Sequence, residues 1–310
     1  MESYLEDCVA SQIVDQTDPR LIRHESATTA GQVRFVDPAG VFTRTGSEGC
    51  EEIPLTIFTL GRFTLLVNGA PADYGRKVPK RPLELLKAII AQGGRDVSTS
   101  RLTTLLWPDV DGDKATGSFD TTLHRLRKFL GDERVLVLRD GKLSLDANYC
   151  RVDVWTLERL LASTKLTIRD ATSTSRISLM EKLTESLLGL YQEHFLVNEE
   201  ATSWSVSMRE RLRSKYIHHL IEIGRFWESQ DRWDQAIECY RKGIDVDDLV
   251  EVFYQRLMHC YLRTRRLSEG MAVYRRCCQT LSVILSLQPE PETESLYLAL
   301  RHARPDRLSA

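Results

Sequence analysis

The sequence predicts a two-part fold, an α+β unit followed by an all-α domain of helical repeats. Two short segments on either side of Gly61 alternate apolar and polar residues, and three stretches with helical spacing and a second alternating segment follow them. After Val152 the pattern is helical almost throughout. We therefore expect a flexible tail or linker over 1–52, the α+β unit over 53–150 and the helical domain over 151–310.

The α+β unit begins with a small antiparallel sheet. LTIFTL and RFTLLV supply two alternating strands, and Asn68-Gly69 is a turn signal after the second. Further along, VLVLRDGKLSLD has the pattern of a hairpin with Asp140-Gly141 at its tip. The expected order of the unit is a sheet, three helices and a hairpin.

The three helices lie between the sheet and the hairpin, and each has recognisable ends. Proline suits a first helical turn, small polar residues suit an N-cap, and glycine or proline ends a helix. The expected signals are Pro82 and Gly93-Gly94 for the first helix, Ser98 and Pro108 for the second, and Asp113 and Gly131 for the third.

Charge is segregated along the chain, and the cysteine pattern argues against a zinc site or a thiol redox motif. The chain has a net charge of −2, but 1–52 holds ten acids and four arginines, which gives −6, and 76–101 holds seven Lys or Arg and two acids, which gives +5. The seven cysteines form no C-x-x-C pair and are expected to be reduced thiols. His259-Cys260 are adjacent, so their side chains should point apart rather than hold a metal ion.

The chain has no apolar run long enough for a membrane helix, and its first residues lack the pattern of a secretory signal. We therefore expect a cytoplasmic, nucleoid-associated protein without membrane contact. No nucleophile, base and orienting group can be assembled from motifs, so no enzymatic activity, cofactor or metal is expected.

A repeat lies in the helical part. RWDQAIECYRK, from 232 to 242, aligns with RLSEGMAVYRR, from 266 to 276, and the offset, 266 minus 232, is 34 residues. A period of 34 residues in helical sequence is that of tetratricopeptide repeats. The expected core positions of the stacked helix pairs are Trp233, Tyr240, Leu267 and Tyr274, although a ligand pocket on the concave face would also use such residues.

The third helix of the α+β unit has two distinct faces. Its apolar stripe consists of Phe119, Leu123, Leu126 and Leu130. A second, polar stripe consists of Thr121, His124, Arg125 and Lys128, and Thr122 and Arg127 lie beside it. A lone helix of this kind could simply present a solvated basic face. A basic third helix followed by a β-hairpin, however, is the arrangement of a winged helix-turn-helix, whose third helix enters the major groove of DNA.

Each polar side chain then has a use. Arg125 can form two hydrogen bonds with a guanine edge, Thr121 can contact a base, and His124 can contact a base or a phosphate. Arg127 and Lys128 suit phosphates, which position the helix without reading sequence. The remaining predicted contacts, from the wing and to the DNA backbone, are Arg139, Lys142, Lys80, Arg81 and Ser98.

These segments resemble a known family. LGRFTLLVNG, KRPLELLKAIIAQGGRDVSTSRLTTLLWP and TTLHRLRKFLG are similar to the OmpR-type winged helix of the bacterial transcriptional activation domain family, which includes the Streptomyces antibiotic regulatory proteins. The resemblance continues through RVDVWTLERLL, LYQEHFL, WSVSMRERLRSKY, the repeats and QPEPETESLYLAL, and covers roughly 54–303. It implies a winged helix that binds promoter DNA and a tetratricopeptide-like domain that supports activation. His124 stands where the family more often has Arg or Ser.

The expected function is therefore that of a sequence-specific transcriptional activator. Its expected partners are double-stranded promoter DNA, RNA polymerase or other transcription machinery, and a second copy of the chain on DNA. Two alternatives stay open at this stage, namely a tetratricopeptide adaptor without a DNA function and a repressor that uses its repeats to dimerise. The absence of acids between Thr121 and Leu130 favours binding to a polyanion over the adaptor.

Overall fold

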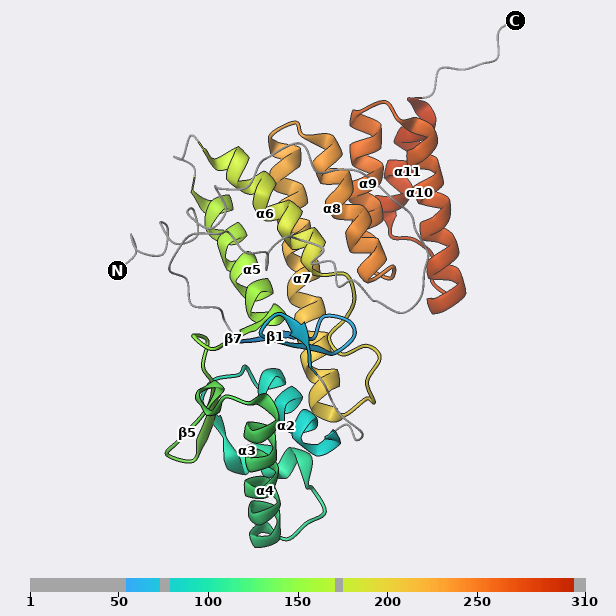
Figure 1. Ribbon diagram of the computed structural model, residues 1–310. Coiled ribbons are helices and arrows are strands. Elements are labelled where there is room, and N and C mark those ends of the chain that lie inside the picture. The colour runs from blue at the N-terminus through green and yellow to red at the C-terminus, as the bar shows by residue number, and fades with distance from the viewer. Residues whose placement is uncertain (1–53, 73–78, 171–174, 304–310) are drawn as a thin grey trace, which may run out of the picture.

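The computed structural model describes residues 54–72, 79–170 and 175–303. The expected tail over 1–52, together with Arg76 and Lys77 of the basic segment, lies outside these residues. The described part contains ten α-helices and two small sheets. Figure 1 shows α4 and the β5 hairpin at one end of the molecule and α10 and α11 at the other, with the small sheet around β1 and β7 between them.

The first sheet has the strand order β3-β2-β1-β7. Its strands are β1 (Leu55–Phe58), β2 (Thr64–Val67), β3 (Ala70–Pro71) and β7 (Cys150–Val152). The expected pair β1 and β2 is antiparallel, and Asn68 and Gly69 both have positive φ in the turn that follows, as their residue types predict. Pairing of β1 with β7 is parallel, so the end of the α+β unit returns to lie beside its beginning.

The predicted three helices follow the first three strands. They are α2 (Lys80–Ala91), α3 (Thr99–Leu106) and α4 (Gly112–Leu130). The glycines after α2 and α4 take the left-handed conformation at Gly93, Gly94 and Gly131, which confirms them as helix stops. The predicted caps were only partly right, because Ser98 occupies the N-cap position without a side-chain cap bond, and α4 begins one residue before Asp113.

The second sheet has the strand order β4-β6-β5. Its strands are β4 (Val97–Ser98), β5 (Leu136–Arg139) and β6 (Lys142–Leu145), and the short helix η1 (Glu133–Val135) leads into β5. Asp140 and Gly141 have φ of 48° and 69°, which is the turn that Asp-Gly favours between antiparallel strands. The backbone N–H of Thr99 donates to the Gly141 carbonyl at 2.9 Å, so the hairpin tip is tied to the start of α3.

Seven helices form the rest of the described chain. They are α5 (Asp153–Arg169), α6 (Arg176–Leu190), α7 (Ser203–Ser229), α8 (Trp233–Val246), α9 (Glu251–Arg263), α10 (Leu267–Thr280) and α11 (Pro291–His302), with a π-helical turn η2 (Leu281–Leu285) after α10. Helices α8 and α10 begin 34 residues apart, which confirms the repeat. None of the described helices is both long and apolar enough to cross a membrane.

The four expected core positions of the repeats differ in burial. Tyr240 is fully buried, and Gly224 lets it approach closely, because a Cβ on that glycine would lie 2.3 Å from the Tyr240 ring. Trp233, Leu267 and Tyr274 are only half-buried. The Tyr274 ring stacks on Tyr297 of α11, with ring centroids 4.1 Å apart. The repeat register was therefore right, but three of the four side chains lie at the margin of the core.

The α+β unit and the helical domain share one continuous core. Long helix α7 packs against α2 of the first part and α8 of the second. Lys87 of α2, which is 8% exposed, forms an ion pair with Glu199 at 2.8 Å and lies over the Phe63 ring. These contacts join α2 of the α+β unit directly to the helical domain.

A buried carboxylate connects the α+β unit to the helical domain. Asp153, the first residue of α5, accepts hydrogen bonds from the N–H and hydroxyl of Thr59, the N–H of Leu60 and the N–H of Val154 at 2.5 to 2.7 Å. Four donors around one carboxylate satisfy a charge that would otherwise be costly to bury. Asp153 therefore fixes the end of β1 to the beginning of the helical domain.

Candidate nucleic-acid interface

Helix α4 presents one face to the core and the opposite face to solvent. Phe119, Leu123, Leu126 and Leu130 are all buried, as their spacing predicted. The helix has an acid in its first turn and basic residues in its last turn, which match the helix dipole, and Gly131 ends it. The core face thus determines which residues of α4 can reach a ligand.

The exposed face of α4 carries the predicted polar stripe. Thr121, His124, Arg125 and Lys128 are exposed. The Thr121 hydroxyl donates to the Gly117 carbonyl at 2.9 Å, which leaves its lone pairs and methyl group accessible. Within the described residues, the side chains of His124, Arg125 and Lys128 make no hydrogen bond or ion pair that would hold them against the protein. The exposed stripe therefore carries two cationic side chains, Arg125 and Lys128, together with Thr121 and His124.

Two predicted contact residues on α4 lie outside the exposed stripe. Thr122 is 7% exposed, and its hydroxyl donates to the Ser118 carbonyl at 2.7 Å, so it cannot face a ligand. Arg127 is half-buried, and its Nη2 donates to the Leu136 carbonyl at 3.1 Å, which ties α4 to β5. Thr122 lies three residues after Phe119, and Arg127 lies four after Leu123, so the helical spacing itself placed both beside the apolar stripe.

The predicted wing residues lie at the hairpin tip. Arg139 and Lys142 are direct partners in the β5–β6 register and are both exposed. Because the tip is bonded to the start of α3, their positions are constrained relative to the helices. Asp140 between them is also exposed and reduces the local positive charge, so the tip offers two cations and one anion.

The three remaining predicted contacts have different surroundings. Lys80 is exposed at the start of α2. Arg81 forms an ion pair with Glu84 at 2.8 Å and also donates to the Leu106 carbonyl, and the Ser98 hydroxyl is bonded to that of Ser100 at 2.7 Å. Lys80 is free to meet a phosphate, whereas Arg81 and Ser98 are already engaged in holding α2 and α3.

Two further cations of the α+β unit are exposed but are not among the predicted contacts. Arg101 on α3 and Lys114 in the first turn of α4 are exposed, and Lys114 is only 3.8 Å from Asp111 in a solvated pair. Arg101 was part of the basic segment but was not singled out. The signal for both was the local positive charge, since neither has a motif of its own.

Among the described residues, one cluster brings possible metal ligands together. The ligand atoms of Glu228, His259 and Cys260 lie within 4.8 Å of one another, so the expectation that adjacent His and Cys must point apart was wrong here. Arg256, however, donates to both oxygens of the Glu228 carboxylate, and the Tyr240 hydroxyl donates to Oε1 at 2.5 Å. Burial also raises the pKa of the Cys260 thiol to about 12. The geometry fits a polar network centred on Glu228 better than a cation site.

Comparison with known proteins gives two findings. The family model described as bacterial transcriptional activator domain matches residues 152–301. The structure is similar to that of Mycobacterium tuberculosis EmbR in complex with a low-affinity phosphopeptide, with a TM-score of 0.59 and 21% sequence identity, over 82% of this chain and 66% of that chain. This chain thus spans slightly less than two thirds of EmbR, and the likeness concerns the fold. No curated protein matches the sequence.

Proposed function

We propose that the chain is a member of the bacterial transcriptional activator domain family, whose model matches residues 152–301, and that it is a transcriptional activator that binds promoter DNA through α4. On this proposal, residues 53–150 are an OmpR-type winged helix, and residues 151–310 are a tetratricopeptide-like activation domain. The boundary between 150 and 151 falls inside β7, which pairs with β1, so the two parts meet within a shared sheet.

The observation that carries the proposal is the exposed stripe of Thr121, His124, Arg125 and Lys128. An α-helix fits the major groove of B-DNA, and a side chain must be unengaged to exchange its water for base edges and phosphates. The basic helix is followed by a hairpin whose tip carries two exposed cations, as a wing that touches the adjacent backbone requires. A protein adaptor would have no need for this cationic bias.

Each side chain of the stripe has an assigned role in the proposal. Arg125 reads a guanine through two hydrogen bonds, and Thr121 contacts a neighbouring base or thymine methyl. His124 contacts a base or a phosphate, and Lys128 contacts a phosphate. Arg139, Lys142 and Lys80 add backbone contacts at the edges of the interface.

The first test separates base reading from phosphate binding. A cognate site is selected from random duplexes, and affinity is measured by fluorescence anisotropy over a range of salt concentrations. We expect Arg125→Ala to cost roughly 1 to 3 kcal/mol on the cognate site and to relax preference at one base pair. Lys128→Ala should weaken all duplexes alike and reduce the salt slope by about 0.9, the contribution of one phosphate contact.

The matched control is Lys165→Ala, which removes an exposed cation from α5. This variant should leave affinity, base preference and salt slope unchanged. Unchanged affinity and preference in Arg125→Ala would instead show that α4 is not the reading helix. If the protein bound no DNA duplex with a salt-dependent affinity, a tetratricopeptide adaptor that binds other proteins would be a better proposal than a DNA-binding regulator.

The repeats are proposed to contact RNA polymerase or other transcription machinery, and a second copy of the chain is proposed to pair with the first on DNA. In vitro transcription with the full chain tests the direction of regulation. An activator should raise the transcript in parallel with promoter occupancy, and Arg125→Ala should lower both together. A transcript that falls as occupancy rises would favour the repressor.

A further inference from the structure

Charge is divided unevenly among the parts of the chain. Residues 1–52 carry −6, whereas residues 53–150 hold fifteen Lys or Arg and eleven acids, which gives +4. Residues 151–310 hold twenty-three of each, so the helical domain is neutral as a whole. Attraction between an anionic and a cationic part of this chain therefore acts between the N-terminal residues and the α+β unit.

The negative charge of the N-terminal part is concentrated in residues 1–19, which we call the acidic segment. It holds five acids and no Lys, Arg or His. Residues 20–52 hold the other five acids together with all four arginines, so their net charge is only −1. The acidic segment therefore carries −5 of the −6, and it resembles a nucleic-acid strand in presenting negative charge without positive charge between.

The exposed stripe of α4 is the surface of the α+β unit that suits this segment. Residues 121–130 contain three cations and no acid. Arg125 and Lys128 among them are exposed, and neither has an ion-pair partner within the described residues. The wing tip has two cations as well, but Asp140 lies between them and reduces their attraction for an anion. The stripe thus offers unpaired positive charge where the acidic segment offers negative charge.

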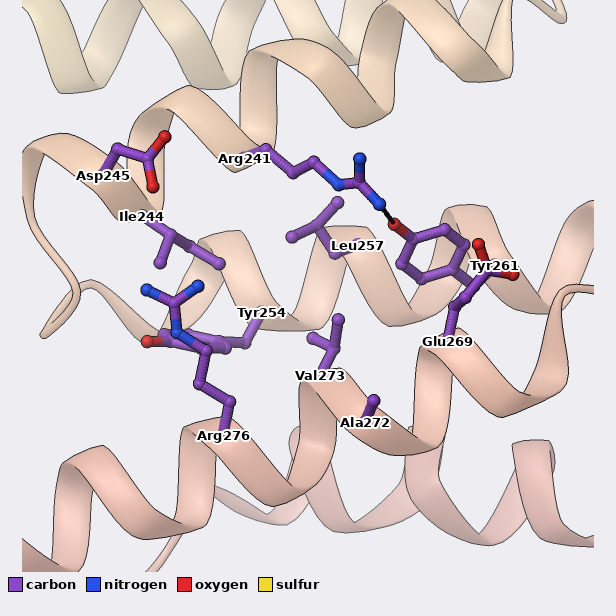
Figure 2. Close-up of a pocket in the computed structure, with 10 residues that line it drawn as sticks. All are labelled: Arg241, Ile244, Asp245, Tyr254, Leu257, Tyr261, Glu269, Ala272, Val273 and Arg276. Carbon is purple, nitrogen blue, oxygen red and sulfur yellow. Dashed lines mark hydrogen bonds between the residues drawn. The ribbon is translucent and has the colours of Figure 1, made fainter.

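The helical domain offers no comparable surface at its groove. This groove lies between α8, α9 and α10, and Figure 2 shows two cations and two acids along it. Arg241 and Asp245 come from α8, and Glu269 and Arg276 come from α10. Arg241 also donates to the Tyr261 hydroxyl at 2.6 Å. The charges of the groove sum to zero, so it does not favour an anionic segment.

The connection between the acidic segment and β1 is long enough for a contact with α4. Residues 20–53 form this connection, which is 34 residues long. Such a length spans up to about 110 Å when extended and about 50 Å at the rise of an α-helix. A unit of about 100 residues is roughly 35 Å across, given its radius of gyration of about 13 Å. Both lengths exceed the distance across the α+β unit, so the acidic segment can reach α4 from β1.

We propose that the acidic segment docks on the exposed stripe of α4 in its own chain and competes with DNA for that surface. This inference rests on the proposed function, because it assigns DNA and the acidic segment to one face. An attached segment acts at an effective concentration of about 1 mM. A weak contact, with a dissociation constant of about 0.2 mM, then covers the stripe in about five of every six molecules and lowers the apparent affinity for DNA about sixfold.

Binding of the cognate duplex by the full chain provides the first test. Neutralising the acidic segment should tighten binding at least about threefold, since it removes the competitor. The variant carries Glu2→Gln, Glu6→Gln, Asp7→Asn, Asp15→Asn and Asp18→Asn. The matched control neutralises the other five acids of 1–52 and should stay close to the parent. It carries Glu25→Gln, Asp37→Asn, Glu48→Gln, Glu51→Gln and Glu52→Gln. An equal gain in both variants would indicate general repulsion from DNA and overturn the docking.

Cross-linking of the full chain without DNA tests the contact itself. A photoreactive amino acid in place of Gln12, within the acidic segment, should join residues 114–142 of the same molecule. Mass spectrometry of a mixture of two isotope-labelled forms distinguishes this from a link between molecules. The yield should fall at least about fivefold in the double variant Arg125→Ala, Lys128→Ala. The control Lys165→Ala, which removes an exposed cation from α5, should keep the yield of the parent.

Three outcomes of the cross-linking would overturn the proposal. They are links to residues 151–303, links between differently labelled molecules, and a yield that the double variant leaves unchanged. Circular dichroism establishes that the variants are folded. Because this experiment uses no DNA, its failure leaves the binding of DNA by α4 standing. A cross-link in a protein that binds no duplex would support the contact and remove only the proposed function.

Discussion

Replacing Asp153 by alanine should separate the end of β1 from the start of α5. The change removes the acceptor for four donors, namely the N–H and hydroxyl of Thr59 and the N–H groups of Leu60 and Val154. Leu60 is half-exposed, so water can replace the carboxylate there, which leaves three buried donors. At about 1 to 3 kcal/mol per unsatisfied buried donor, and with partial relief from water entering the cavity, we expect a loss of about 4 kcal/mol.

Urea unfolding followed by circular dichroism and tryptophan fluorescence measures this loss as a change in the free energy of unfolding. Asp153→Asn should lose less, because its amide oxygen still accepts from some of the donors. Glu185→Ala, which removes an exposed carboxylate from α6, is the control and should change the free energy by less than about 0.5 kcal/mol. A loss below about 1 kcal/mol for Asp153→Ala would refute the argument that this carboxylate joins the two parts.

Two further predictions follow from burial. Tyr240→Ala should lower the free energy of unfolding by roughly 3 to 5 kcal/mol, because it empties a fully buried site and breaks the hydrogen bond to Glu228. Tyr274 is only half-buried, so Tyr274→Ala should lower it by about 1 to 2 kcal/mol. Equal losses in urea unfolding would contradict the difference in burial. Burial, with help from Arg213, lowers the pKa of His194, so its contribution to stability is present above the unfolded pKa of about 6.5 and is lost as the pH falls below it. His194→Gln should therefore reduce the loss of stability on acidification from pH 7.5 to 5.5, and an unchanged pH profile would show that another group is responsible.

Much of the local structure could be read from single residues and spacings. Asn68-Gly69, Asp140-Gly141 and Gly131 all have the positive φ that their residue types favour at those turns and ends. The 34-residue offset in the sequence correctly predicted that α8 and α10 begin at equivalent positions, Trp233 and Leu267. These features depend on backbone sterics and on helical periodicity, which act over a few residues and so are visible in the sequence.

The candidate interface was predictable only in part. The exposed positions Thr121, His124, Arg125 and Lys128 followed from the apolar stripe opposite them. Thr122 and Arg127 lie beside the apolar stripe in helical spacing, but the spacing does not say which neighbouring element covers such a flanking position. That cover comes from the packing of α4 against the rest of the core, as the bond from Arg127 to Leu136 shows.

By itself the sequence therefore determined the order of elements, the repeat and the location of a basic helix, because each depends on short-range periodicity and charge. Only the tertiary structure decided that β1 pairs in parallel with β7, that Asp153 joins residues more than ninety positions apart, and that α7 packs on both parts of the molecule. Such contacts form between segments whose separation in sequence carries no local signal, and their partners are selected by the packing of the whole core.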